Sequence, residues 1–274
     1  MVKIALGSAQ RVRPTSAEKR VSAETGTSLA PIAYAPSCNL DPASPPQPKT
    51  WGGARNRAGR ASIYLSEASV VGMICAADFA ECIGLAFNRH WTVHYQLAGI
   101  AEHDGAAFVG RLLALVRKHI KRQGLETAAL WARENGEGKG GHVHILLHVP
   151  AGMTLRNLTR RWIKSAGGTA ARRASRVRTV GGTVARSHPA SGAYRANSDA
   201  VLAYIIKGAD PATGEGLSLP RFGEAGLILG KRAGWTQNIG AASQRAWRSN
   251  QASLERRERR TAIAWEEQHP VERA

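Results

Sequence analysis

Residues 127–149, TAALWARENGEGKGGHVHILLHV, constrain the fold more than any other stretch. Two apolar runs flank the glycine-rich segment GEGKGG, a pattern typical of two antiparallel strands joined by a turn. Side chains on a strand alternate between its faces, so His142 and His144 project to the same side. The turn folds Glu134, near the end of the first run, back beside them. Two imidazoles and a carboxylate form a workable ligand set for a divalent cation.

A pair of ordinary strand histidines is the competing interpretation, because His-x-His on a strand also occurs in proteins without a metal. His148 shares the face of His142 and His144 but lies about 13 Å beyond His144 on an extended strand, which favours a structural role. Other segments of the chain must decide between a metal site and two structural imidazoles.

Basic residues outnumber acidic residues by a wide margin. The 274 residues include 38 Lys plus Arg and 20 Asp plus Glu, a formal net charge of +18. A partner rich in negative charge is expected, and nucleic acid is the usual one. No uninterrupted apolar run reaches the ~18 residues of a membrane span, which disfavours a membrane partner. The first ten residues lack a secretory apolar run and the three cysteines form no CxxC pair, so a cytoplasmic location is expected.

Composition divides the chain into three segments. Residues 1–60 contain seven of the 12 prolines, from Pro14 to Pro48, and lack apolar periodicity, which predicts a disordered segment. Residues 61–240 are the predicted folded domain. Residues 241–274 have a helical composition and include RRERR, which predicts a tail helix that is solvated or contacts DNA. A coiled-coil dimer is the rival for this tail, but its apolar positions are sparse.

The folded domain alternates helical and extended patterns. Apolar residues in 68–87 indicate a buried helix, and alternation in 89–98 indicates a strand. A helix capped by Asp104 runs to Arg122, the two strands of 127–149 follow, and an amphipathic helix occupies 153–166. This order predicts an α+β fold with a central, mostly antiparallel sheet flanked by helices.

No Asp or Glu occurs from Gly138 through Ser198, whereas 11 Lys or Arg do. A solvated surface normally mixes both signs, so this tract predicts a phosphate-binding surface. Residues 172–188 form either a basic hairpin turning at Gly181 and Gly182 or a flexible basic loop. A later segment, 226–248, includes Lys231, Arg232 and Trp235, and this tryptophan either stacks on a base or packs against the sheet. The predicted DNA-binding residues are Arg156, Arg160, Arg161, Lys164, Arg172, Arg173, Arg176, Arg178, Lys231 and Arg232.

The segment NSDAVLAYIIKGAD indicates a short helix capped by a residue among 197–199. Tyr204 and Lys207 lie three residues apart and therefore on one helical face. A phenol is a poor nucleophile at neutral pH, but it becomes useful beside a metal and a cation that stabilise the developing charge. Tyr204 is a candidate nucleophile, with Tyr194 as the next choice, and Lys207 is the candidate cation. Because Tyr-x-x-Lys is a common pattern, a tyrosine at the edge of the core is the competing interpretation when the motif is taken alone.

Together these motifs resemble the HUH endonuclease superfamily of single-tyrosine replication initiators. His142, Val143 and His144 match the HUH motif, Glu134 matches the carboxylate that often completes the metal site, and Tyr204 with Lys207 matches the nucleophile motif. The similarity covers roughly residues 88–240, and the strand HWTVHYQ departs from the usual pattern of the family's first motif. The resemblance implies a ferredoxin-like or RRM-like palm as the catalytic domain.

The resemblance also implies a reaction: Mg2+ or Mn2+ holds the scissile phosphate of single-stranded DNA, often at a hairpin origin, and the tyrosine forms a 5′-phosphotyrosyl link. Such nicking and joining initiates rolling-circle replication of a plasmid or phage, with a host helicase and polymerase as partners. No P-loop spacing is present, so no nucleotide cofactor is expected. The alternatives are a non-catalytic single-strand binder of the same fold, a relaxase- or transposase-type nickase, and a phosphoesterase that uses water.

Overall fold

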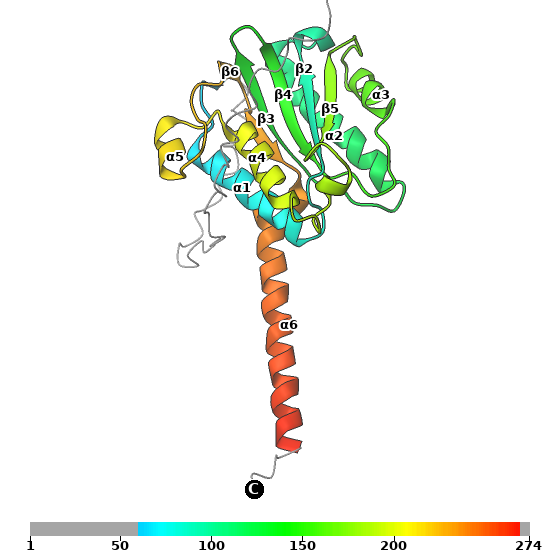
Figure 1. The fold of residues 1–274 in the computed structure, drawn as a ribbon, viewed down its shortest axis with the longest axis vertical. Helices are drawn as coiled ribbons and strands as arrows, with labels where there is room; N and C mark the ends of the chain where they lie inside the picture. The colour runs from blue at the N-terminus through cyan, green and yellow to red at the C-terminus, as the bar shows by residue number, and fades with distance from the viewer. Residues whose placement is uncertain (1–59, 269–274) are drawn as a thin grey trace, which may run out of the picture. The chain divides into compact units, whose positions relative to one another are not determined.

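The computed structural model describes residues 60–268 (Figure 1). The segment 1–60, predicted to be disordered, lies outside the described residues except for its last position. The end of the predicted tail, 269–274, also lies outside them.

A five-stranded sheet and a separate two-stranded sheet contain the strands β1 (Ala61–Ser62), β2 (Arg89–His94), β3 (Ala129–Gly136), β4 (Gly140–Leu147), β5 (Ser175–Thr179), β6 (Ile228–Leu229) and β7 (Ala233–Trp235). The order in the larger sheet is β5–β2–β4–β3–β7, and its neighbouring strands are antiparallel. β1 pairs with β6. The predicted α+β class with an antiparallel sheet is confirmed.

Helices flank the larger sheet, as the sequence predicts (Figure 1). The α-helices are α1 (Glu67–Cys82), α2 (Gly105–Lys121), α3 (Leu158–Ser165), α4 (Tyr194–Ile206), α5 (Pro211–Gly216) and α6 (Ala241–Gln268). Short 3-10 turns are η2 (Gln96–Ala98), η3 (Glu102–Asp104), η4 (Ala185–Ser187) and η5 (Gln237–Ile239).

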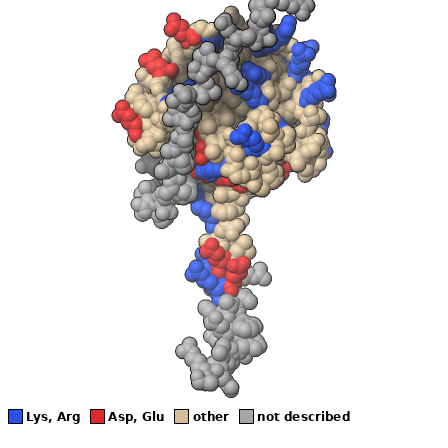
Figure 2. Space-filling model, viewed as in Figure 1, with Lys and Arg blue, Asp and Glu red and all other residues tan. Residues whose placement is uncertain are grey.

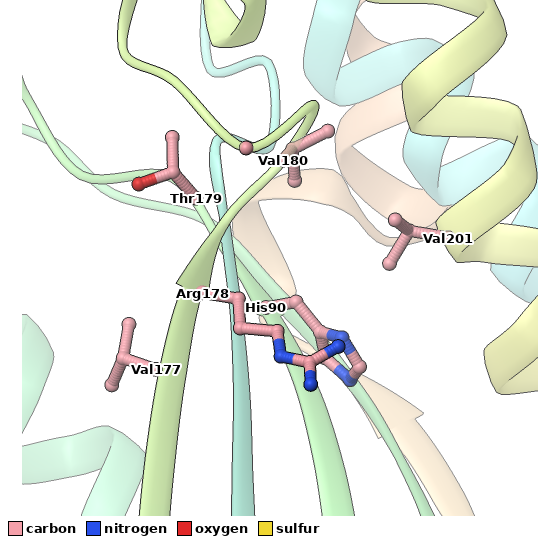
Figure 3. A pocket seen from close by; sticks show the side chains of 7 residues that line it. His90, Val177, Arg178, Thr179, Val180 and Val201 are labelled. Carbon is pink, nitrogen blue, oxygen red and sulfur yellow. The ribbon is translucent and has the colours of Figure 1, made fainter. Parts of the chain in front are cut away.

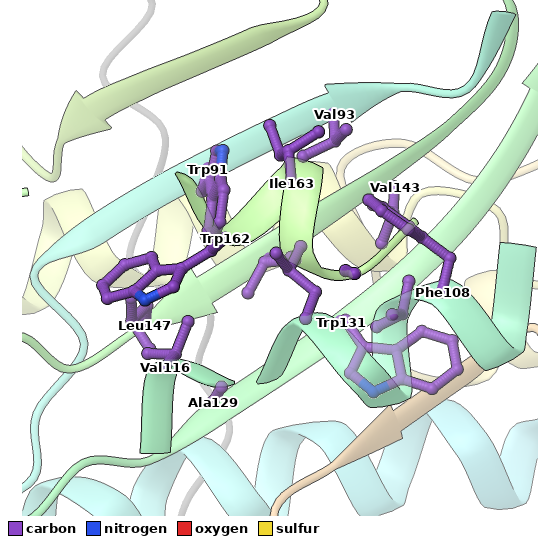
Figure 4. Close-up of a cluster of buried hydrophobic side chains, with 14 of the residues drawn as sticks. Trp91, Val93, Phe108, Val116, Ala129, Trp131, Val143, Leu147, Trp162 and Ile163 are labelled. Atoms are coloured by element: carbon purple, nitrogen blue, oxygen red, sulfur yellow. The ribbon is translucent and has the colours of Figure 1, made fainter. Parts of the chain in front are cut away.

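One face of the sheet packs against α2 and α3 (Figure 4). Alternation along the strands directs Trp91 of β2 and Ile145 of β4 to this face, where both are fully buried. Phe108 of α2 and Trp162 of α3 close over them. Burial of each large apolar side chain contributes on the order of 2 kcal/mol, so this cluster is a main source of stability.

The opposite face of the sheet packs against α1 and α4. Leu130 of β3 and Leu146 of β4 lie in this second core with Met73 of α1 and Ile205 of α4. This face also carries the side chains of Glu134 and the histidine pair, so it is called the site face below. The two cores hold the strands and α4 in fixed relative positions, and the candidate site depends on that arrangement.

The predicted basic hairpin does not form, because only its first arm is a strand. This strand, β5, pairs with β2 rather than with the residues that follow it. After the turn at Gly181 and Gly182 the chain enters η4, where the Ser187 hydroxyl donates to the carbonyl of Val184 at 2.8 Å. Hydrogen bonds in this turn are local, and the partner of β5 lies far away in the sequence. The alternation of residues 175–179 reflects that distant pairing.

Two helices begin at other residues than the sequence predicts. α4 starts at Tyr194, ahead of the three predicted caps, because the Tyr194 ring is buried and its hydroxyl donates to the Phe87 carbonyl at 3.2 Å. α3 starts only at Leu158, since Asn157 adopts a left-handed conformation (φ 65°) that ends any helix before it. The predicted tail helix is confirmed as α6, which begins at Ala241.

Candidate metal site and nucleophile

The hairpin formed by β3 and β4 brings the predicted ligands together. Glu134 lies directly opposite His142 in the strand register, and Ala132 lies opposite His144. Residues directly opposite each other on antiparallel strands project to one face, so the carboxylate and both imidazoles share the site face. Gly138 (φ 74°) in the connecting turn has a left-handed conformation that glycine adopts without strain. The predicted fold-back of the carboxylate onto the histidines is therefore confirmed.

The ligand atoms of Glu134, His142 and His144 lie within 4.8 Å of one another, and all three residues are buried. The Nε2 atoms of His142 and His144 are 3.5 Å and 3.8 Å from Glu134 Oε2. Two imidazole nitrogens and one carboxylate oxygen thus converge on one point. This donor set suits a divalent cation and leaves coordination positions free for a substrate.

The hydrogen bonds of the two imidazoles leave their Nε2 atoms available as ligands. His142 Nδ1 donates to the carbonyl of Gly140 at 2.9 Å, which fixes the proton on Nδ1. His144 Nδ1 lies 3.0 Å from Thr92 Oγ1 and 3.1 Å from His90 Nε2, while its buried Nε2 has no hydrogen-bond partner. A buried nitrogen without a partner costs free energy unless something fills that role, and a metal ion would do so.

The protonation states of the cluster also suit a metal. Burial lowers the pKa of His144 to about 2, so its imidazole is neutral. Burial acts to raise the pKa of Glu134, but the charges nearby, that of the paired Lys207 among them, outweigh burial and lower this pKa to about 2. A neutral imidazole and an ionised carboxylate are the forms that bind divalent cations.

Tyr204 and Lys207 of the α4 region lie directly over this cluster. The Tyr204 ring centroid is 5.1 Å from that of His144, in an edge-on arrangement. Lys207 Nζ donates to Glu134 Oε1 and lies 4.3 Å from the Tyr204 ring centroid. Glu134 therefore uses one oxygen for the lysine and presents the other to the histidines. Burial and the Glu134 carboxylate raise the pKa of the Tyr204 phenol above its usual value.

Tyr194, the second candidate nucleophile, has a different environment. Its side chain is 2% exposed and its hydroxyl donates to the backbone of Phe87. This tyrosine anchors the first turn of α4 and is separated from solvent. His148 is likewise structural, as its Nδ1 donates to the Ala86 carbonyl at 2.8 Å.

His90 and Thr92 of β2 belong to the same cluster, although the sequence interpretation did not single them out. Thr92 lies directly opposite His144 in the strand register. The His90 ring centroid is 6.0 Å from that of Tyr204. Alternation in HWTVH puts both residues on one face, but only the pairing of β2 with β4 reveals that this is the site face. That pairing joins segments about fifty residues apart, which sequence periodicity does not report.

Two of the predicted DNA-binding arginines share the site face. Arg176 and Arg178 of β5 are exposed and lie opposite Thr92 and His90 in the strand register. Since β2 alone separates β5 from β4, these arginines lie about two strand spacings, roughly 10 Å, from the strand that carries the histidines.

The remaining predicted DNA-binding residues lie elsewhere. α3 packs on the opposite face of the sheet through Trp162 and Ile163, so its basic side chains lie away from the site face. Lys231 is exposed and its Nζ is 5.5 Å from the ring centroid of Trp131, which also points to that opposite face. The other predicted DNA-binding residues are exposed: Arg156, Arg160, Arg161 and Lys164 lie around α3, and Arg172 and Arg173 lie in the loop before β5.

Arg232 does not lie on a surface at all. It is 6% exposed, its Nε donates to Ser62 Oγ at 3.0 Å, and its Nη2 donates to the carbonyls of Ser62 and Gly226. The guanidinium joins three chain segments and is not accessible to phosphate, so the prediction of a DNA contact here was wrong. Trp235, by contrast, packs in the second core, which confirms packing over base stacking for this residue.

Charge is unevenly distributed over the surface that the structure describes. Figure 2 shows Lys and Arg side chains on the side where β5 and α3 lie in Figure 1, and Asp and Glu side chains near α5. Within residues 60–268, none of the helices has the length and apolar character that crossing a membrane requires.

Comparison of this chain with protein-family models, curated proteins and solved structures found no match.

Proposed function

We propose that this protein is a metal-dependent DNA nicking and joining endonuclease of the single-tyrosine HUH type. It acts on a single-stranded or hairpin origin and initiates rolling-circle replication of a plasmid or phage. The observation that carries the proposal is the position of the Tyr204 ring, 5.1 Å from the His144 ring, with Lys207 paired to Glu134. Such a transesterification needs a metal-binding site, a phenol and a positively charged side chain in contact with one another.

Glu134, His142 and His144 would hold the cation, since their free donor atoms converge on one point. Mg2+ or Mn2+ bound there would supply positive charge to the phosphate oxygens. Lys207 holds one oxygen of Glu134 and so fixes the orientation of the carboxylate toward the two imidazoles.

Tyr204 is the nucleophile in this proposal. Its phenol oxygen forms a bond to phosphorus while the bond from phosphorus to the 3′ oxygen breaks, and the proton that the phenol loses is balanced by the one that the departing oxygen gains. Lys207, 4.3 Å from the ring centroid, stabilises the negative charge that develops on the phenol oxygen. The raised pKa of Tyr204 keeps the phenol protonated in the resting protein.

The products explain why no nucleotide cofactor is needed. The 5′-phosphotyrosyl link conserves the energy of the broken phosphodiester, and the free 3′ hydroxyl can either be extended by a host polymerase or attack the link and rejoin the strand. A host helicase would unwind the duplex, and the reaction would occur in the cytoplasm. Arg176 and Arg178 on the site face would bind the strand near the nucleophile.

The test is adduct formation by wild type and Tyr204→Phe. Each protein is incubated with Mn2+ and single-stranded origin DNA labelled at its 3′ end, because that fragment would stay on the tyrosine. Wild type should give a labelled protein band on a denaturing gel, and Tyr204→Phe should give none. Tyr194→Phe is the matched control and should keep forming the adduct.

Four other outcomes would contradict the proposal, each in a different way. An adduct that survives Tyr204→Phe would remove this residue as the nucleophile. Cleavage without an adduct would favour a phosphoesterase that uses water. Binding without cleavage by the wild-type protein would favour a non-catalytic single-strand binder. A relaxase- or transposase-type nickase would form the adduct on DNA from a transfer origin or a transposon end instead of a replication origin.

A further inference from the structure

A pocket of about 500 Å³ opens between the edge strand β5 and helix α4 (Figure 3). This volume falls within the roughly 300–1,000 Å³ of typical small-ligand pockets. The proposed chemistry at Tyr204 does not use it. Its lining residues are His90, Val177, Arg178, Thr179, Val180, Gly182 and Val201.

The pocket adjoins the candidate nucleophile. His90 lines it and also contacts the cluster, with its Nε2 3.1 Å from His144 Nδ1 and its ring centroid 6.0 Å from that of Tyr204. Val201 lies three residues before Tyr204 on α4, so the two side chains share one face of the helix. A strand whose phosphate lies at Tyr204 would therefore place a neighbouring nucleotide at the mouth of this pocket.

The walls of the pocket combine apolar and planar groups. Val180 and Val201 contribute methyl groups, while Arg178 and His90 lie on directly opposed strand positions and face the same side (Figure 3). No carboxylate lines the pocket. A flat heterocycle next to a phosphate matches this lining, since it can stack on the guanidinium or imidazole plane.

We propose that this pocket binds the base of a nucleotide adjacent to the scissile phosphate, with Arg178 contacting the base plane and its phosphate. The assignment rests on the proposed function, because the scissile phosphate is placed by Tyr204. A base that enters the pocket cannot remain stacked in a duplex. The pocket would thus restrict the substrate to unpaired nucleotides and add a contact that a bare phosphate backbone lacks.

The test measures binding without cleavage, in EDTA, by fluorescence anisotropy. Two labelled probes have the same backbone charge: the thymidine 12-mer dT12, and a 12-mer in which every base is absent. In Val201→Trp the indole fills the pocket. We expect this variant to bind dT12 about tenfold more weakly, the loss of roughly one stacked base, and to bind the abasic strand within about twofold of wild type.

A matched pair of exposed arginines provides a second measurement that does not perturb the core. Arg178→Gln should reduce the preference for dT12 over the abasic strand, whereas Arg176→Gln, on the same face of β5 but outside the pocket, should leave that preference unchanged. Thermal unfolding monitored by circular dichroism identifies any variant that has lost its fold. If Val201→Trp does not fold, the arginine pair decides.

Two results would overturn the base pocket. In the first, Val201→Trp loses affinity equally for dT12 and the abasic strand, and Arg178→Gln and Arg176→Gln change the preference for dT12 over the abasic strand by the same amount. The other is a wild-type protein that binds dT12 no better than the abasic strand. Neither result depends on adduct formation. A failed adduct test would remove the proposed function and leave base-dependent binding in place, and a failed binding test would do the reverse.

Discussion

The Tyr204 ring packs edge-on against the His144 ring, 5.1 Å away between centroids, although the two residues belong to a helix and a strand distant in the chain. Core packing holds this contact: Ile205, beside Tyr204 on α4, lies in the same buried cluster as Leu146 of β4. The adjacency of phenol and imidazole is thus a consequence of how α4 covers the site face. A flexible loop would not fix the distance in this way.

Loss of one ligand should separate metal binding from DNA binding. We expect His144→Ala to abolish Mn2+ binding measured by isothermal titration calorimetry, since the cluster loses one of its three donors. Salt-dependent binding of single-stranded DNA should persist, because phosphate contacts arise from basic residues outside the cluster. His148→Ala, directly after β4, is the control and should keep Mn2+ affinity, as its imidazole bonds to Ala86. Equal loss in both variants would argue against a metal cluster.

The partners of His144 Nδ1 should affect metal affinity without touching the metal. Thr92 and His90 orient the imidazole so that Nε2 points toward Glu134. Removal of both partners in Thr92→Val/His90→Leu should weaken Mn2+ binding by about tenfold, the usual scale for groups that position a metal ligand. Thr92→Ser keeps the hydroxyl and should bind Mn2+ as wild type does. Unchanged affinity in the double variant would show that neither residue orients His144.

Glu134 should make stability depend on pH below about 4.5. Its pKa is lowered from 4.5 to about 2 in the folded protein, so the folded state favours the ionised carboxylate. That contribution is fully present above pH 4.5 and is lost as the pH falls from 4.5 toward 2. The free energies of unfolding of wild type and Glu134→Gln are measured by urea titration in EDTA. The difference between them should be constant from pH 6 to 8, and at lower pH wild type should lose stability relative to the variant. A difference that stays constant down to pH 3 would contradict the lowered pKa.

Local patterns predicted the β3–β4 hairpin and its three ligands, because a period of two and a glycine-rich turn are properties of neighbouring residues. Tyr204 and Lys207 came from their resemblance to a family motif; what the structure adds is that they contact His144 and Glu134. The contribution of His90 was missed, since it depends on which strand lies beside β2. Strand order is set by long-range packing, and no short segment encodes it.

The distribution of charged residues along the sequence predicted the positions of basic side chains in the fold least reliably. A run without acidic residues does not reveal to which face of the sheet its side chains project. The basic residues of β5 and α3 therefore appeared equivalent, although Arg176 and Arg178 lie on the site face and α3 covers the opposite face. The assumption that arginine is exposed failed at Arg232, which donates to the carbonyl of Ser62, far away in the sequence, and to that of Gly226 nearby. A single buried guanidinium of this kind carries no signal in the sequence, because its neighbours Lys231 and Ala233 have no common pattern with it.

Arg232 and Lys231 offer a direct comparison between a buried and an exposed cation. Arg232→Met would leave the carbonyls of Ser62 and Gly226 without their donor, which should cost about 1–3 kcal/mol in the free energy of unfolding. Lys231→Gln removes an exposed charge and should change stability by less than about 0.5 kcal/mol. Urea titrations of the two variants measure this difference. An Arg232→Met variant that is as stable as wild type but has lost affinity for single-stranded DNA would contradict the structural role of this buried arginine.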